Sequence, residues 1–398
     1  MHICINAQLL SFSQNYRNGG VSRYIRYLLT GLARDPGKHE YTVFVNGQDA
    51  VERLAARHPQ ITYISAPWSE SQPATRVVWE QLTLPSLIRQ KHIDLLHSPV
   101  NVLPRLLPQQ CTGVITLHDL AFLRFPSVLT RAKRLYHRTF TVRSIRQATS
   151  IITVSDSTKR DVIELIGIPE ERLQTVYTCI DSRFSNVLTL EEIQVFRQKQ
   201  GLANGYLLYL GTLEPRKNII TLIEAYAQLR KAHTIREKLV LAGGKGWLYD
   251  AIFERVRQLG LEAEVIFPGF VADTEQALWY SAAAAFVYPS LYEGFGIPVT
   301  EALACGVPVV TSNISSLPEA GSGLALCIDP HNVEEMAGAL YKALTDEELR
   351  QTCRNMAPTV AQQFSTQRMV AQTIHAYERA TTLHTASQGR TQNISFVR

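Results

Sequence analysis

The chain has 398 residues, of which 45% are hydrophobic and 19% charged, and a formal net charge of +5. Because this length exceeds the size at which one hydrophobic core stops growing, we expect a folded protein of two domains. The composition excludes a disordered or collagen-like chain, and no apolar run approaches the roughly 20 residues of a membrane span.

The cysteines and the first residues indicate a reducing, cytoplasmic location. The six cysteines form no Cys-x-x-Cys pair and lie mostly in apolar segments, which argues against a zinc site or a disulfide framework. The opening residues, Met-His-Ile-Cys-Ile-Asn, are typical of a strand and not of a secretory leader. We therefore expect a protein of the cytoplasm.

Short apolar runs alternate with amphipathic stretches along the whole chain, which is typical of parallel sheets flanked by helices. We therefore expect an α/β fold with two doubly wound, Rossmann-like sheets. The expected strands of the first sheet lie near 2–6, 41–45, 61–64, 93–97, 113–117, 150–154 and 174–177. Those of the second sheet lie near 206–210, 238–242, 264–267, 284–288, 308–311 and 325–328.

This alternation predicts where the domains divide. We expect an N-terminal domain over 1–185 and a C-terminal domain over 186–364. The connection 186–205 includes a helix. This helix should begin at the capping-box pattern Thr189-Leu-Glu-Glu192. A final helix near 365–381 should cross the domain boundary, and the aperiodic remainder of 365–398 should form a loose tail.

Positive charge is concentrated in the first half of the chain. Residues 1–185 contain 22 Lys or Arg and 14 Asp or Glu, a net +8, whereas the remainder contains 18 and 21, a net −3. Segment 131–146 carries cations but no acid, interleaved with apolar residues at helical spacing. This segment is either a solvated helix face or a surface for anionic lipid or a phosphorylated acceptor, and nucleic acid is disfavoured because no recognition motif accompanies it.

Polar residues and glycines directly follow many of the expected strands. They are His97, Ser98, His118, Asp119, Ser155, Gly211, Gly243, Gly244, Pro289 and Ser290. Ligands of doubly wound sheets bind beyond the carboxyl ends of the strands. We therefore expect these residues to line one cleft between the two domains.

Two expected helix starts suit anions. Gly19 and Gly20 precede one apolar helix face, and Arg216 and Lys217 precede another that we expect Asn218 to cap. Two cations at the positive end of a helix are misplaced unless an anion lies between them. We therefore expect Arg216 and Lys217 to neutralise a diphosphate, although they could also be a solvated pair of cations. Gly19 and Gly20 could likewise form only a turn without a ligand.

The most informative stretch is 288–308, where Glu293 and Glu301 bracket a Gly-Phe-Gly turn that opens a short helix. Pro298 suits the first helical position and Gly306 the position just past the end, so the helix starts close to Gly296. Its free amides suit a phosphate, and the carboxylates suit the vicinal hydroxyls of a ribose or a sugar. The stretch therefore predicts a pocket for a nucleotide sugar.

This stretch resembles the Glu-x7-Glu motif of the retaining family 4 glycosyltransferases, which have the GT-B fold. The resemblance covers nearly the whole chain in the same order. It also includes Gly19-Gly20, His118-Asp119, Ser155 and the run from Gly211 to Asn218. One departure is Thr212, because many members carry Arg at that position, so the division of work between Arg216 and Lys217 is left open.

The resemblance implies a role for each matched position. Residues 1–185 would bind the acceptor and residues 186–364 the donor. Glu301 would bind the donor ribose, while Glu293, Gly294 and the amides of Phe295, Gly296 and Ile297 would bind the transferred sugar. Gly211, Thr212, Arg216 and Lys217 would lie at the diphosphate, Val271 at the base, and Gly19, Gly20 and Ser155 at the donor phosphates or the acceptor. His118, which by itself could be an ordinary core histidine, would contact the sugar near the reacting carbon.

The resemblance therefore implies a retaining glycosyltransferase that moves a hexose to an acceptor hydroxyl in glycan, polysaccharide or glycolipid assembly. GDP-mannose is the favoured donor and a UDP-sugar the second. No metal is expected, because no Asp-x-Asp is present to hold one against the diphosphate. Two alternatives stay open, namely a GT-B nucleotide-sugar epimerase and a non-catalytic GT-B scaffold that binds lipid or a partner enzyme.

Overall fold

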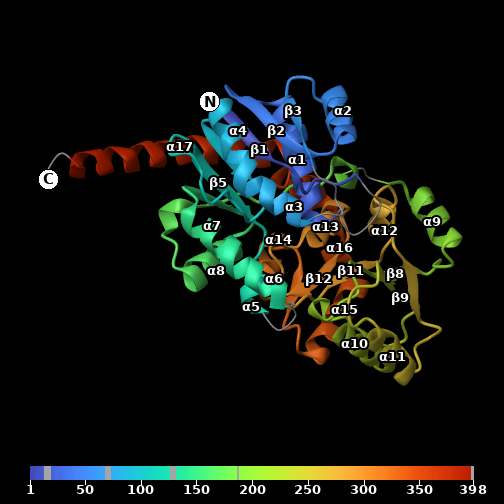
Figure 1. Cartoon of the computed structure of the whole chain (residues 1–398). Helices are drawn as coiled ribbons and strands as arrows, with labels where there is room; N and C mark the ends of the chain where they lie inside the picture. Colours follow the sequence, from blue (N-terminus) through green and yellow to red (C-terminus); the bar gives the residue numbers. More distant parts are fainter. Residues whose placement is uncertain (13–18, 68–72, 126–130, 186–187, 396–398) are drawn as a thin grey trace. The chain divides into compact units, whose positions relative to one another are not determined.

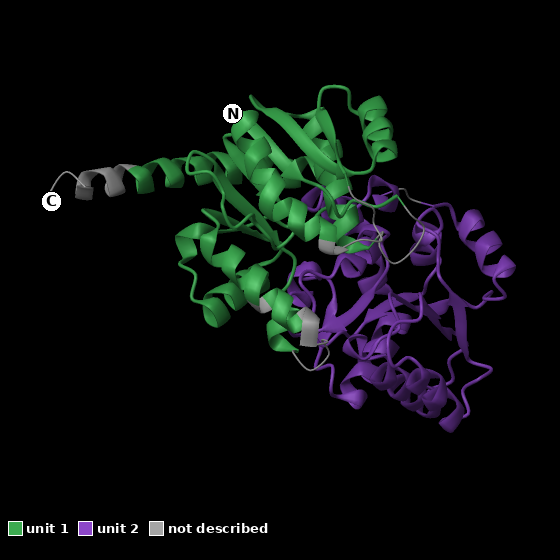
Figure 2. Ribbon diagram, in the orientation of Figure 1, with its two compact units in different colours: residues 1–179, 366–398 green, residues 180–365 purple. Residues whose placement is uncertain are grey.

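The computed structural model describes residues 1–12, 19–67, 73–125, 131–185 and 188–395. The chain forms two compact units (Figure 2). Unit 1 contains Met1–Cys179 and Thr366–Arg398, and unit 2 contains Ile180–Ser365. The chain therefore leaves unit 1 once and returns to it for its last helix.

Unit 1 is built on a seven-stranded, fully parallel sheet with the strand order β3-β2-β1-β4-β5-β6-β7 (Figure 1). Its strands are β1 (His2–Asn6), β2 (Glu40–Asn46), β3 (Thr62–Ala66), β4 (Leu95–Ser98), β5 (Thr112–Leu117), β6 (Ser150–Thr153) and β7 (Leu173–Thr175). Every residue of β4, β5 and β6 is buried. Such burial on both faces is typical of parallel sheets that helices cover on each side.

The helices of unit 1 include two that are interrupted by a π-helical turn. The helices are α1 (Gly20–Arg34), α2 (Gln48–Arg57), α3 (Pro73–Val78), α4 (Leu84–Gln90), α5 (Ala121–Arg124), α6 (Arg131–Tyr136), α7 (Val142–Gln147), α8 (Asp156–Ile166) and α17 (Thr366–Ser395). A π-helical turn over Trp79–Thr83 joins α3 to α4, and a second over His137–Thr141 joins α6 to α7. Each pair of helices therefore forms one continuous rod with a local bulge.

Unit 2 has the same kind of architecture, a parallel sheet of six strands in the order β10-β9-β8-β11-β12-β13. The strands are β8 (Tyr206–Leu210), β9 (Lys238–Ala242), β10 (Val265–Gly269), β11 (Ala285–Tyr288), β12 (Val309–Ser312) and β13 (Leu326–Ile328). The helices are α9 (Leu190–Lys199), α10 (Ile219–Ala232), α11 (Asp250–Gln258), α12 (Gln276–Ser281), α13 (Ile297–Ala304), α14 (Leu317–Ala320), α15 (Val333–Thr345) and α16 (Glu347–Gln363). The expected capping box is present at the start of α9, where Thr189 and Glu192 bond reciprocally.

The strand order confirms the two doubly wound sheets, and each expected strand is found within two residues of its place. In unit 1 the order reverses between β1 and β4, and in unit 2 between β8 and β11. Ligands of open α/β sheets bind at such a reversal, beyond the carboxyl ends of the strands. The loops that follow β1 and β4 in unit 1, and β8 and β11 in unit 2, are therefore the places to look for a site.

The expected loose tail after residue 381 is wrong, because α17 continues to Ser395 (Figure 1). Hydroxyls within the segment bond back to the preceding turn, as when Thr381 donates to the carbonyl of Tyr377 and Thr385 to that of Thr381. His384 and the amide of Gln388 also bond the carbonyl of Gln109. These bonds support a helix whose apolar periodicity is too weak to reveal it.

Helix α17 packs on α1 through a close contact at Gly31, where an added Cβ would lie 2.3 Å from Cγ2 of Val370. The same helix reaches the core of the sheet through Tyr377, whose hydroxyl lies 2.6 Å from Nδ1 of His97. Nε2 of His97 lies 2.8 Å from Oγ1 of Thr116. His97, expected just past the end of its strand, is instead fully buried within β4 and has a structural role.

Candidate active site

The turn that opens α13 adopts a conformation that requires glycine. Gly296 has φ +107°, and an added Cβ would lie 2.8 Å from Cδ2 of Leu317. The helix runs over Ile297–Ala304, with Pro298 at the second helical position and Gly306 just past the end at φ +74°. The start of this eight-residue helix is therefore fixed at the carboxyl edge of the sheet, directly after β11.

Arg216, Lys217 and Glu293 form one ion cluster beside this turn. Lys217 Nζ donates to Glu293 Oε1 at 2.5 Å, and Arg216 Nη1 lies 3.1 Å from Glu293 Oε2. Arg216 Nη1 also donates to the carbonyl of Tyr292 at 2.6 Å. The two cations come from the turn after β8 and the carboxylate from the loop after β11, so the cluster spans the strand-order reversal.

The cluster is balanced in charge. Glu214 accepts from Arg216 Nη2 at 2.8 Å, so two carboxylates face two cations. Burial would raise the pKa of Glu293, but the charges of Lys217 and Arg216 outweigh it and lower that pKa to about 2. Glu293 is therefore ionised at neutral pH. An incoming anion would have to compete with it for the two cations.

Several residues that the sequence left without a role hold this cluster in place. Tyr288 is buried and accepts a hydrogen bond from Lys217 Nζ at 2.6 Å. Ser315 Oγ accepts from the Glu293 amide and donates to its carbonyl, and Ser316 Oγ lies within hydrogen-bond distance of the carbonyls of Glu293 and Phe295. These serines follow β12, which is the same strand-end signal that identified other site residues.

Glu301 does not join this cluster through the described contacts. It lies in α13, is 1% exposed, and accepts a hydrogen bond from the Tyr280 hydroxyl at 3.0 Å. Asn218 also differs from its expected role, because its side chain does not cap α10. Its Nδ2 instead donates to the carbonyl of Pro330, and its Oδ1 accepts from Thr221.

The remaining donor-side positions lie at strand ends of unit 2. Gly211 follows β8 and passes so close to Gly243 that a Cβ on Gly243 would lie 1.9 Å from the Gly211 carbonyl oxygen. Thr212 is exposed and offers its carbonyl to the Tyr209 hydroxyl. Val271 is buried just after β10. All three therefore lie on the carboxyl edge of the same sheet as the ion cluster.

In unit 1, His118 follows β5 and lies beside Tyr24 with ring centroids 5.0 Å apart. Its Nε2 donates to the carbonyl of Pro99 at 2.9 Å, which leaves Nδ1 as the acceptor nitrogen of the neutral ring. Burial lowers the pKa of His118, although the Pro99 carbonyl and Asp119 act in the opposite direction. Asp119 itself accepts from the Ala121 amide, so it caps the next turn and does not orient the ring.

The other expected residues of unit 1 lie at helix starts. Gly19 and Gly20 are exposed at the start of α1, directly after residues 13–18, which lie outside the described part of the chain. Ser155 is fully buried and caps α8 by accepting from the Thr158 amide at 3.0 Å. A structural use therefore already accounts for the Ser155 hydroxyl.

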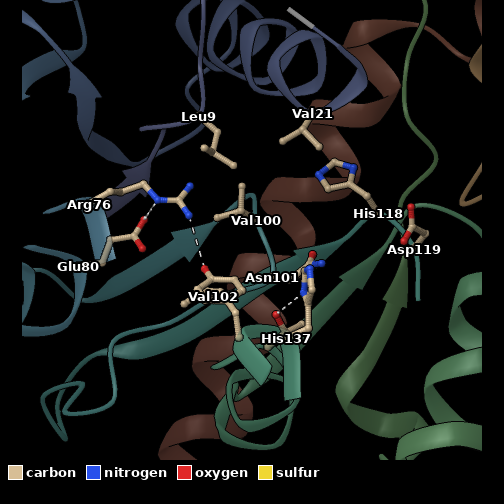
Figure 3. Close-up of a pocket in the computed structure, with 12 residues that line it drawn as sticks. Leu9, Val21, Arg76, Glu80, Val100, Asn101, Val102, His118, Asp119 and His137 are labelled. Carbon is tan, nitrogen blue, oxygen red and sulfur yellow. Dashed lines mark hydrogen bonds and ion pairs between the residues drawn. The ribbon is translucent and has the colours of Figure 1, made fainter. Parts of the chain in front are cut away.

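His118 and Asp119 border a pocket of about 270 Å³ within unit 1 (Figure 3). Its polar lining also includes Arg76, Glu80 and Asn101. Sequence patterns do not reveal these three residues, because they lie in irregular or interrupted helical segments and belong to no motif. The pocket lies at the carboxyl ends of β1, β4 and β5, and so at the strand-order reversal of unit 1.

The described residues contain neither a candidate metal-binding cluster nor a candidate membrane-spanning helix. Within these parts of the chain, no group of three or more His, Cys, Asp or Glu side chains is placed to hold a metal ion. No helix among them combines the length and the apolar character that a membrane crossing requires.

Two family models match the chain. Residues 18–184 match Glycosyltransferase Family 4, and residues 192–360 match Glycosyl transferases group 1. O-antigen chain mannosyltransferase B of Escherichia coli is 35% identical over 284 residues, which is 71% of this chain and 74% of that protein. Serotype-specific mannosyltransferase WbdA, also of Escherichia coli, is 34% identical over 225 residues, or 55% of this chain and 27% of that longer protein.

A solved structure extends the likeness to the fold. Anabaena HepE in complex with UDP and glucose has a TM-score of 0.70 at 20% identity, covering 95% of this chain and 99% of that one. Both sheets of the chain therefore have counterparts in one known architecture, GT-B. The matches to both halves, together with the 35% identity to a mannosyltransferase over most of each protein, show that this chain is a glycosyltransferase of family 4, in the group 1 glycosyltransferases.

Proposed function

We propose that the chain transfers a mannose residue, with retention of configuration, from GDP-mannose to a hydroxyl of a growing glycan. The observation that carries this proposal is the ion cluster of Arg216, Lys217 and Glu293 at the start of α13. Two cations beside a carboxylate and a helix start offer charge to a diphosphate and acceptor oxygens to a sugar.

Donor binding exchanges the partners within this cluster. The diphosphate takes over Arg216 and Lys217, which then stabilise the charge on the leaving group. Glu293 turns to the hydroxyls of the transferred sugar, beside Gly294 and the amides of Phe295, Gly296 and Ile297. Glu301 holds the ribose, and Gly211, Thr212 and Val271 border the nucleotide.

His118 contributes from unit 1. Its neutral ring contacts the sugar near the reacting carbon and stabilises positive charge there as the bond to phosphate breaks. The acceptor hydroxyl attacks on the same face, and the leaving phosphate takes its proton. Gly19, Gly20 and Ser155 are proposed to lie at the donor phosphates or the acceptor, and closure of the domains completes the site.

The relatives support the choice of sugar. Two of them are named mannosyltransferases, and one of these is named for the O-antigen chain, so mannose transfer in polysaccharide assembly is the first choice. A UDP-sugar is second, because the structurally similar HepE binds UDP and glucose. The transfer is proposed to need no metal, since Arg216, Lys217 and the start of α13 supply the positive charge.

One experiment tests donor and reaction together. The chain is screened by thermal shift and calorimetry against GDP-mannose, UDP-glucose, GDP and UDP, with and without EDTA, and then incubated with each donor alone. We expect GDP-mannose to stabilise most and EDTA to have no effect. An epimer formed from donor alone would support the epimerase, and absence of binding to every nucleotide would support the scaffold. Restoration of EDTA-abolished transfer by Mg²⁺ or Mn²⁺ would contradict metal independence.

We further propose that unit 1 contacts anionic lipid on the cytoplasmic face of a membrane. Arg134, Arg143 and Arg146 are exposed along α6 and α7, and Leu135 is 67% exposed beside them. Exposed cations together with an exposed apolar side chain suit a charged bilayer surface. Sedimentation with phosphatidylglycerol vesicles but not with phosphatidylcholine vesicles is expected, and equal binding to both would contradict the proposal.

A further inference from the structure

The pocket of unit 1 is formed where two π-helical turns meet the ends of the central strands (Figure 3). Glu80 lies in the first turn, Trp79–Thr83, and His137 and Thr141 lie in the second. A π-helical turn inserts one residue into a helix and so redirects the side chains around it, and such turns occur often at functional sites. Both interruptions in the helices of this unit therefore supply lining residues to one pocket.

Two buried polar atoms of the lining form no hydrogen bond among the described residues. Nε of Arg76 and Oδ1 of Asn101 are buried atoms, and no described residue forms a hydrogen bond with them. Leaving such an atom unpaired costs about 1–3 kcal/mol, so a hydrogen-bonding ligand would be stabilised there. The pocket thus offers a donor from Arg76 and an acceptor from Asn101.

Arg76 and Glu80 form a loose ion pair that leaves room for a ligand. Arg76 Nε lies 3.9 Å from Glu80 Oε1, and Arg76 Nη2 donates to the Tyr136 hydroxyl at 3.5 Å. Glu80 is 3% exposed, and its Oε1 accepts from Asn6 Nδ2 at 3.1 Å. No described residue donates to Glu80 Oε2. A guanidinium and a carboxylate separated in this way can bind two neighbouring hydroxyls of one ring.

The charge and size of the lining select the kind of ligand. The lining contains one guanidinium, that of Arg76, and the two carboxylates of Glu80 and Asp119, so it has no excess positive charge with which to bind a phosphate or a uronate. Its apolar part comes from Leu9, Val21, Val100 and Val102 and suits the C–H face of a sugar. The volume of about 270 Å³ is just below the range of about 300–1,000 Å³ for drug-sized ligands, which suits a single ring.

We propose that this pocket binds the terminal ring of an uncharged acceptor sugar, with Arg76 donating to one hydroxyl and Glu80 accepting from its neighbour. The inference rests on the proposed function and deepens it, because it names the acceptor class and two residues that select it. His118 borders the same pocket, so a ring held there lies next to the residue proposed to act at the reacting carbon.

The test uses the full chain with three probes: methyl α-mannoside, methyl α-glucoside and methyl α-glucuronide. Saturation-transfer NMR measures their binding, and transfer from GDP-mannose or UDP-glucose measures their KM as acceptors. The variants are Arg76→Gln and Glu80→Gln, and the matched control is Arg89→Gln, an exposed arginine of α4 that does not line the pocket. GDP and UDP affinities and the melting temperature are measured for every variant.

We expect the neutral glycosides to bind at least about tenfold more tightly than the glucuronide. Arg76→Gln and Glu80→Gln should raise the acceptor KM roughly 10- to 100-fold, since each removes a hydrogen bond to a charged group, and leave nucleotide affinity unchanged. An unchanged KM in both folded variants, equal binding of the glucuronide, or no binding of neutral glycosides would overturn the assignment. Glycoside binding lost in both variants, without turnover of any nucleotide sugar by the unmodified chain, would contradict the proposed function but support a sugar site here.

Discussion

The two units place different chemistry at the same point of the same topology. In unit 2 the strand-order reversal between β8 and β11 has an ion cluster, with Lys217 and Arg216 at 2.5 and 3.1 Å from Glu293. In unit 1 the reversal between β1 and β4 has a pocket bordered by His118, whose lowered pKa keeps the ring neutral. The fold thus fixes where ligands bind, and the loop residues decide which ligands they are.

This difference suits two substrates of different charge. A nucleoside diphosphate needs cations, and unit 2 has two of them beside carboxylates that balance their charge. An uncharged sugar needs hydrogen bonds without excess charge, and unit 1 supplies these from a balanced lining. Changes that remove charge should therefore act mainly through unit 2, whereas changes of hydrogen bonding or protonation should act mainly through unit 1.

The largest effect is expected from Glu293→Gln. The variant should lower kcat by roughly 10²- to 10³-fold, because it removes the charged contact proposed between Glu293 and the transferred sugar. It should also destabilise unit 2 by about 3–5 kcal/mol, since Lys217 and Arg216 lose their shared carboxylate. Steady-state kinetics and chemical denaturation measure the two effects.

Glu254→Gln is the matched control for this variant. Glu254 pairs with Arg257 on the surface of α11, and both side chains are more than half exposed. Such a pair contributes about 0–1 kcal/mol, so neither kcat nor stability should change noticeably. Equal losses in Glu254→Gln and Glu293→Gln would show that the cluster has no special role.

His118→Ala should lower kcat by about 10²-fold while leaving the calorimetric affinity for GDP within about twofold. The reason is that His118, which lies in unit 1, is proposed to act on the reacting carbon, whereas the nucleotide is proposed to bind unit 2. His331→Ala, which changes an exposed histidine of unit 2, should leave both quantities unchanged. Unchanged turnover in His118→Ala would remove His118 from the site.

Acid should weaken unit 1 before it weakens the cluster of unit 2. Burial lowers the pKa of His97 from 6.5 to about 3, so the unfolded chain binds a proton that the folded chain refuses as the pH falls below 6.5. Between pH 6.5 and 4.5 this should cost about 2–3 kcal/mol. The stabilisation from Glu293 is present above its ordinary pKa of 4.5 and declines only as the pH falls from there toward about 2.

Hydrogen exchange followed by mass spectrometry at pH 7 and pH 4.5 would measure this difference, with peptides from β4 and α17 compared with those from β11 and α13. We expect protection to fall more in the unit 1 peptides. His97→Gln should reduce that difference, because it removes the titrating ring. A uniform loss of protection in both units would contradict the assignment to His97.

The sequence could predict the sheets and the start of α13 because both depend on strong local signals, whereas the ion pairs of Glu293 with Arg216 and Lys217 were not predicted. Parallel strands buried on both faces form unbroken apolar runs, and Gly296, Pro298 and Gly306 define α13 by their backbone preferences. Arg216, Lys217 and Glu293 follow strands that the topology makes neighbours, so strand ends alone brought them together.

Features that depend on tertiary contact could not be predicted in this way. His97 lies one residue before the end of β4. Its structural role becomes visible through the contact with Tyr377 of α17, which is distant in the sequence. The pocket residues Arg76 and Glu80 depend on a π-helical turn, which changes side-chain directions without altering composition. The extent of α17 depends on bonds to Gln109, which is distant in the sequence.

The smallest expected effect separates a structural from a functional hydroxyl in unit 1. Ser155 caps α8, so Ser155→Ala should lower the free energy of unfolding by about 1 kcal/mol. Asn332→Ala provides the counterpart in unit 2, because Asn332 caps α15 by accepting from the Glu335 amide at 3.0 Å. Equal losses of stability with unchanged KM in both variants would show that the Ser155 hydroxyl serves only to cap α8. A rise in the donor or acceptor KM confined to Ser155→Ala would instead support the contact with phosphate or acceptor that the family resemblance implies.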